Sequence, residues 1–196
     1  MAKRTSAQAA ETREAILAAA RSLFAAQGYA GTSLAGIVEA ARVTKGALFH
    51  HFDKKEDLFL EVWRQLQIEM DAAAAEAAIR SRSKADPYAA FLAGCRVYLE
   101  WSTRPDYQRV VLIDGPAVLG MERWHKLDFE LGSENMMRGT EFLARRGHFP
   151  LDLARPAALM LQGALNGAGF ALSAETPEIT PDQAFLTFER LLRGLR

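Results

Sequence analysis

Apolar residues recur at spacings of three and four along almost the whole chain, and the strict alternation typical of half-buried strands is nearly absent. In the first such segment one face carries Ile16, Leu17, Ala20, Leu23 and Phe24. This pattern predicts an amphipathic helix that Gly28 ends, because glycine readily takes a left-handed conformation at a helix C-terminus. The chain as a whole is therefore predicted to be all-α.

Two short helices separated by a tight turn are predicted next. Their inward faces consist of Leu34, Ile37, Val38 and Ala41 in the first and Leu48, Phe49 and Phe52 in the second. Thr32 or Ser33 can cap the first helix and Thr44 the second, because a hydroxyl oxygen accepts a hydrogen bond from a helix-terminal amide. This arrangement over about residues 33–52 predicts a helix-turn-helix, which presents one helix to the DNA major groove.

Longer helices are predicted for the rest of the chain. A fourth helix begins after residue 55 and buries Leu58, Phe59, Val62, Trp63 and Leu66, and a polar break follows at residues 81–87. Further helices are expected at about 87–103, 107–113, 119–146, 153–174 and from 181 onward, with a turn at 114–116. The prediction is thus about nine helices: a three-helix helix-turn-helix domain at residues 1–57 and a larger helical domain at residues 58–196.

Composition is consistent with a folded soluble protein, since 49% of the 196 residues are hydrophobic and 24% are charged. Polar residues dominate the first twelve positions, and no apolar run reaches the ~18 residues that a membrane span needs. We therefore expect a cytoplasmic protein without a membrane partner. Cys95 is the single cysteine, which excludes an intramolecular disulfide and a cysteine-based metal site.

Charge is distributed unevenly although the formal net charge is zero. Residues 1–55 contain eight Lys and Arg against four acidic residues, and residues 56–196 contain the other sixteen against twenty. A basic N-terminal part on an acidic body is expected when one end meets phosphates, although a four-charge imbalance also arises by chance.

Residues 24–29, 32–33, 43–52 and 55–59 together closely resemble the TetR family of bacterial transcriptional regulators. The likeness covers about residues 12–62. It implies that the larger domain binds an effector and forms a dimer, and that the protein is a repressor whose effector releases operator DNA.

The resemblance places the DNA-recognition helix at about residues 44–50. The DNA-binding residues that it implies are Ser33, Thr44, Lys45, Gly46, Ala47, Phe49, His50 and Lys55. Lys45 can reach a guanine edge or a phosphate, and Ala47 can touch a thymine methyl group. Ser33 and Thr44 are equally explained as helix caps, and Lys55 as a solvated charge. Lys3 and Arg4 are expected to form an arm that enters a minor groove.

Two positions depart from the family pattern. Arg42 stands in the turn where glycine is usual, so the turn is either strained by roughly 1 kcal/mol or has another geometry. Phe49 stands where tyrosine is most frequent, which removes a hydroxyl that could bind a phosphate. Both changes are expected to weaken or retune DNA contact.

The last two helices are predicted to form a homodimer interface. Small residues line one side of the penultimate helix (Gly163, Ala164, Gly167, Ala168 and Ala171), and an apolar stripe follows the last one (Phe185, Phe188, Leu191, Leu192 and Leu195). The alternative is that both stripes face the core of their own subunit.

Aromatic residues and methionines in the larger domain are candidates for an effector pocket. The candidate ligand-binding residues are Phe91, Tyr98, Trp101, Met121, Trp124, Met137, Gln162 and Asn166, with Met160 nearby. They favour an apolar or aromatic ligand, although the same residues would serve a plain helical core. A pair formed by His125 and Asp128 is too weak a signal for a metal site.

Other functional classes find less support in the sequence. We see no nucleophile with a base at a suitable spacing, no phosphate-binding loop and no acidic metal cluster, so we expect neither an enzyme nor a cofactor. A DNA-binding regulator without a ligand, or an activator, remains as the alternative to a ligand-released repressor.

Overall fold

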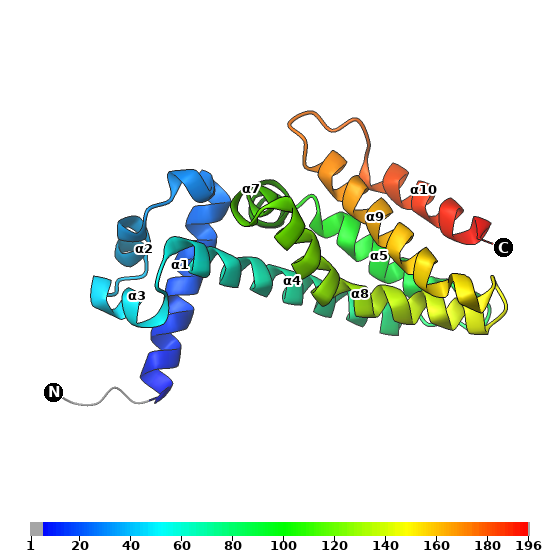
Figure 1. Ribbon diagram of the computed structural model, residues 1–196, viewed down its shortest axis with the longest axis horizontal. Helices are drawn as coiled ribbons and strands as arrows, with labels where there is room; N and C mark the ends of the chain where they lie inside the picture. Colours follow the sequence, from blue (N-terminus) through cyan, green and yellow to red (C-terminus); the bar gives the residue numbers. More distant parts are fainter. Residues whose placement is uncertain (1–5, 196) are drawn as a thin grey trace. The chain divides into compact units, whose positions relative to one another are not determined.

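The computed structural model describes residues 6–195, and within that range all regular secondary structure is helical, as predicted (Figure 1). The α-helices are α1 (Ser6–Gly31), α2 (Leu34–Ala40), α3 (Lys45–His51), α4 (Lys55–Arg80), α5 (Ala89–Trp101), α6 (Pro105–Tyr107), α7 (Gly115–Leu119), α8 (Met121–Arg145), α9 (Ala154–Leu172) and α10 (Pro181–Gly194). A π-helix, η1 (Gln108–Asp114), and a short 3₁₀-helix, η2 (Leu151–Leu153), complete the order. None of the helices within residues 6–195 combines the length and the apolar character of a membrane span.

The chain divides into two compact units. The first contains the described residues up to Leu66 together with Pro105–Gly120, and the second contains Gln67–Arg104 and the described residues from Met121 onward. Helix α4 is continuous and contributes residues to both. The functional division expected at residue 57 stays a prediction, since compactness alone does not say which residues bind DNA.

The core of the first unit forms around the helical face predicted for α1. Ile16, Leu17 and Phe24 are buried there, and the ring of Phe24 meets Phe59 of α4 edge to face with centroids 5.2 Å apart. Gly28 interrupts α1 with φ 70° and ψ 173°. The glycine therefore takes positive φ as predicted, and the chain turns toward α2.

Hydroxyl caps begin both short helices of the helix-turn-helix. The Ser33 hydroxyl accepts a hydrogen bond from the amide of Gly36 at 3.0 Å, and the Thr44 hydroxyl accepts one from the amide of Ala47 at 3.1 Å. Thr32 does not cap α2, because its hydroxyl donates to the carbonyl of Gly28. The predicted caps at Ser33 and Thr44 are confirmed.

The segment between α5 and α8 differs from the prediction. A turn was expected at residues 114–116, but α7 begins there, and the break comes instead at Gly120 with φ 79°. Pro116 suits the first turn of a helix because its missing amide would have had no partner in that turn. The predicted turn was therefore wrong, because Pro116 lies in the first turn of a helix and not in a turn between helices.

The second unit is a helical bundle. Helix α8 packs along α9, and α5 packs against both α9 and α10. Trp124, Leu165 and Phe188 are buried in its core. Helix α10 begins with a capping box, in which the Thr180 hydroxyl accepts from the Gln183 amide and the Gln183 side chain accepts from the Thr180 amide.

Candidate DNA-reading head and ligand cavity

The exposed side of α3 contains four of the eight residues predicted to bind DNA. Lys45, Gly46 and His50 are exposed, and the Lys45 ammonium lies 5.8 Å from the ring centroid of Phe49, which is itself 41% exposed. No atom lies within 4 Å of the position that a Cβ at Gly46 would occupy. The N-terminal turn of α3 is thus open to a large partner.

Ala47 lies on the opposite side of α3. It is only 6% exposed and neighbours Leu48, which is fully buried. Its methyl group offers little surface to a thymine, so the contact predicted for Ala47 stays a prediction without support from its position.

The turn between α2 and α3 keeps the left-handed geometry that is strained for a residue other than glycine. Arg42 has φ 53°, the one positive φ of a non-glycine residue within the described chain. The amide of Val43 donates to the carbonyl of Val38, and the amide of Arg42 donates to that of Glu39, which together form a Schellman motif. Arg42 therefore occupies the left-handed position that usually carries glycine.

Arg42→Gly is expected to raise the free energy of unfolding by up to about 1 kcal/mol, because it removes left-handed strain at a modest cost in unfolded-chain entropy. Urea denaturation followed by circular dichroism measures the difference. Arg42→Ala is the matched control, since it removes the charge but keeps a Cβ at positive φ. An equal gain for both variants would attribute the effect to charge and refute the strain.

Lys55 fastens the end of α1 to the beginning of α4. Its ammonium donates to the carbonyl oxygens of Tyr29 at 2.8 Å and Thr32 at 2.9 Å, and lies 4.0 Å from the ring centroid of Tyr29. Cations stabilise helix C-termini in this way. Lys55 thus has a structural role in the absence of DNA, and its contact with a phosphate stays a prediction.

Polar contacts tie the segment 105–120 to α1. Asp106 pairs with Arg21 at 2.8 Å, and the Asp114 carboxylate accepts from the amide of Tyr29 at 2.6 Å and from Nε of Arg109 at 3.2 Å. The sequence carries no signal for this attachment, because the partners are about 85 positions apart. The attachment nonetheless positions the end of α1, where Lys55 also binds.

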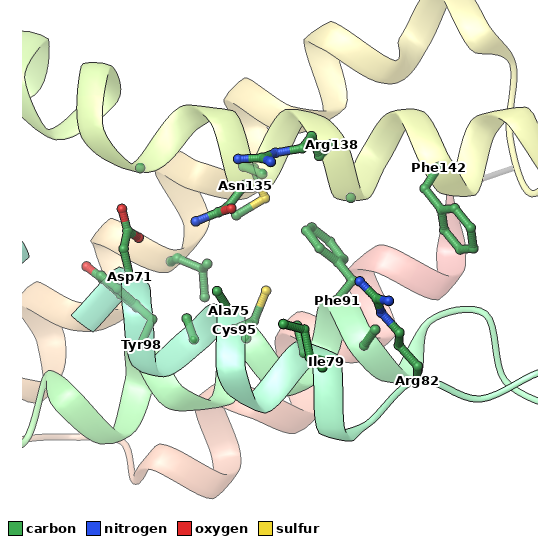
Figure 2. A pocket seen from close by; sticks show the side chains of 18 of the residues that line it. Asp71, Ala75, Ile79, Arg82, Phe91, Cys95, Tyr98, Asn135, Arg138 and Phe142 are labelled. Atoms are coloured by element: carbon green, nitrogen blue, oxygen red, sulfur yellow. The ribbon is translucent and has the colours of Figure 1, made fainter. Parts of the chain in front are cut away.

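A cavity of about 850 Å³ lies in the second unit and is lined by α4, α5, α8, α9 and the loop before α5. Of the predicted ligand-binding residues, Phe91, Tyr98 and Gln162 line it. Figure 2 shows Phe91 and Tyr98 facing the hollow from the same helix.

Five predicted ligand-binding residues do not line the cavity. Trp124 is fully buried in the core, Met121 is 51% exposed, and the Trp101 ring stacks under the Arg104 guanidinium. Met137 is half-buried on α8, and nearby Met160 is 77% exposed. Asn166 lies just behind the wall and accepts a hydrogen bond from the Tyr98 hydroxyl at 3.1 Å.

Polar residues that the sequence did not single out as ligand contacts line the cavity as well. Asp71 and Asn135 point toward each other in Figure 2, and Asp128 lines the same cavity. Asp128 is 5% exposed and accepts hydrogen bonds from Gln67 at 2.9 Å and Asn166 at 2.7 Å. In a helical pattern a carboxylate is expected on the solvent side, so the sequence contained no sign of its burial.

The outer face of α9 and α10 is apolar and exposed. Its large exposed side chains are Leu159, Met160, Leu186 and Leu191. Gly163 and Gly167 lie on the same side of α9, and no atom comes within 4 Å of a Cβ built at either. Phe188 and Leu192 of the predicted stripe are instead buried within the unit.

Comparison with known proteins identifies the family. The family described as "Bacterial regulatory proteins, tetR family" matches residues 16–62, and that described as "Tetracyclin repressor-like, C-terminal domain" matches residues 88–195. A crystal structure of a TetR-family transcriptional regulator from Pectobacterium atrosepticum is 35% identical, covering 98% of this chain and 97% of that one, with a TM-score of 0.81.

Curated relatives match over the N-terminal part. The HTH-type transcriptional regulator AcrR of Shigella flexneri is 51% identical over 63 residues, which are 32% of this chain and 29% of that protein. The HTH-type transcriptional repressor BepR of Brucella suis is 47% identical over 60 residues, 31% of this chain and 29% of that protein. The chain thus spans about three-tenths of the length of these curated relatives. Together with the C-terminal match and the full-length structural likeness, this shows that the chain belongs to the TetR family of DNA-binding bacterial transcriptional regulators.

Proposed function

We propose that the protein is a homodimeric, cytoplasmic transcriptional repressor that leaves its operator DNA when a small organic ligand fills the cavity of the second unit. The observation that carries this proposal is the continuity of α4. We use the term head for α1, α2, α3 and the beginning of α4. Helix α4 contributes Lys55 to the head and contributes Gln67, Met70 and Asp71 to the cavity wall. A ligand that shifts α4 therefore acts on the helix that holds the end of α1.

The DNA-reading residues are proposed from exposure and position. The N-terminal turn of α3 would hold a phosphate with its amides and the Thr44 hydroxyl, and Ser33 would add a second hydroxyl from α2. Lys45 and His50 would read bases, Gly46 would admit the backbone closely, and Phe49 would pack on the sugar-phosphate edge. The arm predicted at Lys3 and Arg4 lies outside the described residues.

A dimer would bring two heads onto one operator. One head covers few base pairs, and half-sites on one face of the duplex lie about 34–36 Å apart. The exposed apolar face of α9 and α10 is the surface we assign to the dimer, because Gly163 and Gly167 allow another helix to approach closely. Repression is supported by the relatives' description, since BepR is described as a repressor.

Lys45→Ala is expected to cost about 1–3 kcal/mol of operator binding and to relax sequence preference at one base pair. Operator fragments selected from genomic DNA, followed by gel shifts on single-base variants, measure both effects. Lys126→Ala removes an exposed lysine of α8 outside the head and serves as the control. Weakening that is uniform across all base variants would assign Lys45 to a phosphate and refute base reading.

Ligand control is tested separately. A thermal-shift screen of small organic molecules identifies compounds that stabilise the protein, and each is added to the protein–operator complex. Release of DNA by a stabilising compound supports the proposal, and a reporter gene that rises on ligand addition supports repression. Stabilisation without release, or a reporter that falls, favours the ligand-independent regulator or the activator.

A further inference from the structure

Two carboxylic acids line the same cavity, and neither is part of a salt bridge within the described residues. Asp71 of α4 and Asp128 of α8 both line it, and Asp128 is 5% exposed. Within the described part of the chain, no ion pair involves either group. Buried charges are normally paired, because removal from water costs several kcal/mol for each ion.

Neutral amides hold Asp128 in place. Gln67 and Asn166 donate to its two oxygens, while Tyr98 and Gln162 donate to the carbonyl oxygen of Asn166. Such a network orients the carboxylate but adds no positive charge of its own, and the cation that acts on Asp128 is the exposed His125 of the same helix. A carboxylate held in this way can still accept a hydrogen bond from a donor bound in the cavity, because each carboxylate oxygen has more than one acceptor site.

Asp71 lines the same cavity and is half-buried. Burial, together with the nearby charge of Asp128, raises the pKa of Asp71 to about 6, although the hydrogen bond from Asn135 lowers it. Burial likewise raises the pKa of Asp128, against the lowering by hydrogen bonds from Asn166 and Gln67 and by the charge of His125. The charge of Asp128 therefore disfavours the ionised form of Asp71, and a cation between the two groups would offset this effect.

The remaining wall is apolar along its length. Its inner surface includes Met70, Ala74, Ala78, Phe91, Met136 and Leu165. Gly139 lets the Phe91 ring lie against α8, since a Cβ there would come within 2.2 Å of the ring. This wall suits an alkyl chain or a ring system rather than a sugar or a nucleotide.

Basic residues line the cavity as well, but in exposed positions. Arg82 and Lys84 come from the loop before α5, Arg138 pairs with Glu134, and the Arg146 guanidinium lies over the Phe142 ring. Exposed charges contribute about 0–1 kcal/mol to a pair. A ligand anion would therefore gain little at these residues and would be repelled by the half-buried Asp71 and the buried Asp128.

We propose that the ligand of this cavity is an amphiphile bearing a protonated amine, whose ammonium group lies between Asp71 and Asp128 and whose apolar body lies along the α4 and α5 wall. The proposal rests on the proposed function, because it names the ligand that such a regulator would sense. It replaces the broader expectation of an apolar or aromatic ligand with a defined charge.

The test compares three probes that share one chain: decylammonium, decan-1-ol and decanoate. Calorimetric titration of the full-length protein without DNA, below the micellar concentration of each probe, measures their affinities. We expect decylammonium to bind at least about tenfold more tightly than the other two. Tighter binding of decanoate, equal binding of all three, or no binding of any would overturn the proposal.

Two isosteric variants locate the ammonium. Asp71→Asn and Asp128→Asn are each expected to weaken decylammonium at least about tenfold and to leave decan-1-ol within about twofold. Asp152→Asn, an exposed carboxylate outside the cavity, is the matched control. Should Asp128→Asn fail to fold, Asp71→Asn alone decides, and unchanged decylammonium affinity in that variant overturns the proposal.

Failure of this inference is distinguishable from failure of the proposed function. The titrations need no operator, so a protein that binds decylammonium but no DNA contradicts the proposed function alone. A protein whose operator complex responds to other ligands, with no preference for the amine, contradicts the ligand class alone.

Discussion

Gly167→Arg is expected to convert the protein into a folded monomer that binds its operator at least about 100-fold more weakly, because linking two heads multiplies affinity by roughly 10²–10⁴. Gly167 is exposed on α9, and no atom of the subunit lies within 4 Å of a Cβ at this position. The subunit therefore accepts a larger side chain, and arginine also favours the helix over glycine by about 1 kcal/mol. A partner helix packed against the glycine would be displaced.

Sedimentation velocity and gel shifts on one operator measure both parts of this prediction. Ala72→Arg is the control, since it places the same side chain on an exposed position of α4 away from α9 and α10. A Gly167→Arg protein that still sediments as a dimer would refute the assigned interface. A monomer with undiminished operator affinity would refute the need for two heads.

The second large effect is expected for Gly28→Ala, which should lower the free energy of unfolding by about 2 kcal/mol. Gly28 has φ 70° and ψ 173°, a backbone conformation that residues other than glycine rarely adopt. A Cβ would also come within 2.1 Å of the Arg109 guanidinium. This contact would disturb the hydrogen bond from Arg109 to Asp114. It would also disturb the Asp114 carboxylate, which accepts a hydrogen bond from the Tyr29 amide.

Gly31→Ala is the matched control in the same helix. Its Cβ would meet only the Cβ of Gln27, at 3.4 Å, so we expect a change within about 0.5 kcal/mol. Urea denaturation measures both variants, and Arg109→Ala in each background separates the two causes. Rescue of Gly28→Ala by Arg109→Ala would assign the loss to the steric clash, whereas no rescue would assign it to the backbone. Equal stability of Gly28→Ala and the wild type would contradict both.

The head could be predicted in detail from the sequence because its signals are local. Ser33 and Thr44 cap helices through amides three positions ahead, and the burial of Ile16, Phe24 and Leu48 follows from helical periodicity. Periodicity is least informative for small residues. Ala47 illustrates this, since an alanine suits a buried face and an exposed face equally well, and only the structure shows that it is buried.

The structure of the segment 105–120 could not be predicted from local sequence patterns. Pro116 is compatible with a turn and with the first turn of a helix, and residue spacing does not distinguish them. The attachment of this segment to α1 depends on two contacts between residues about 85 positions apart. Asp106 pairs with Arg21, and Asp114 accepts a hydrogen bond from the Tyr29 amide. Tertiary contacts decided this segment.

The sequence by itself determined an all-helical chain, a helix-turn-helix with its caps, and the family to which both belong, because helix periodicity, hydroxyl caps and glycine turns act over a few residues. Only the tertiary structure decided which side chains surround the cavity. Aromatic residues and methionines were expected there, yet Trp124 is in the core, whereas Asp71 and Asp128 line the hollow. From the sequence alone, a carboxylate on a helix is expected to face solvent. Its position in the cavity depends on the packing of four helices, which brings together residues far apart in the chain.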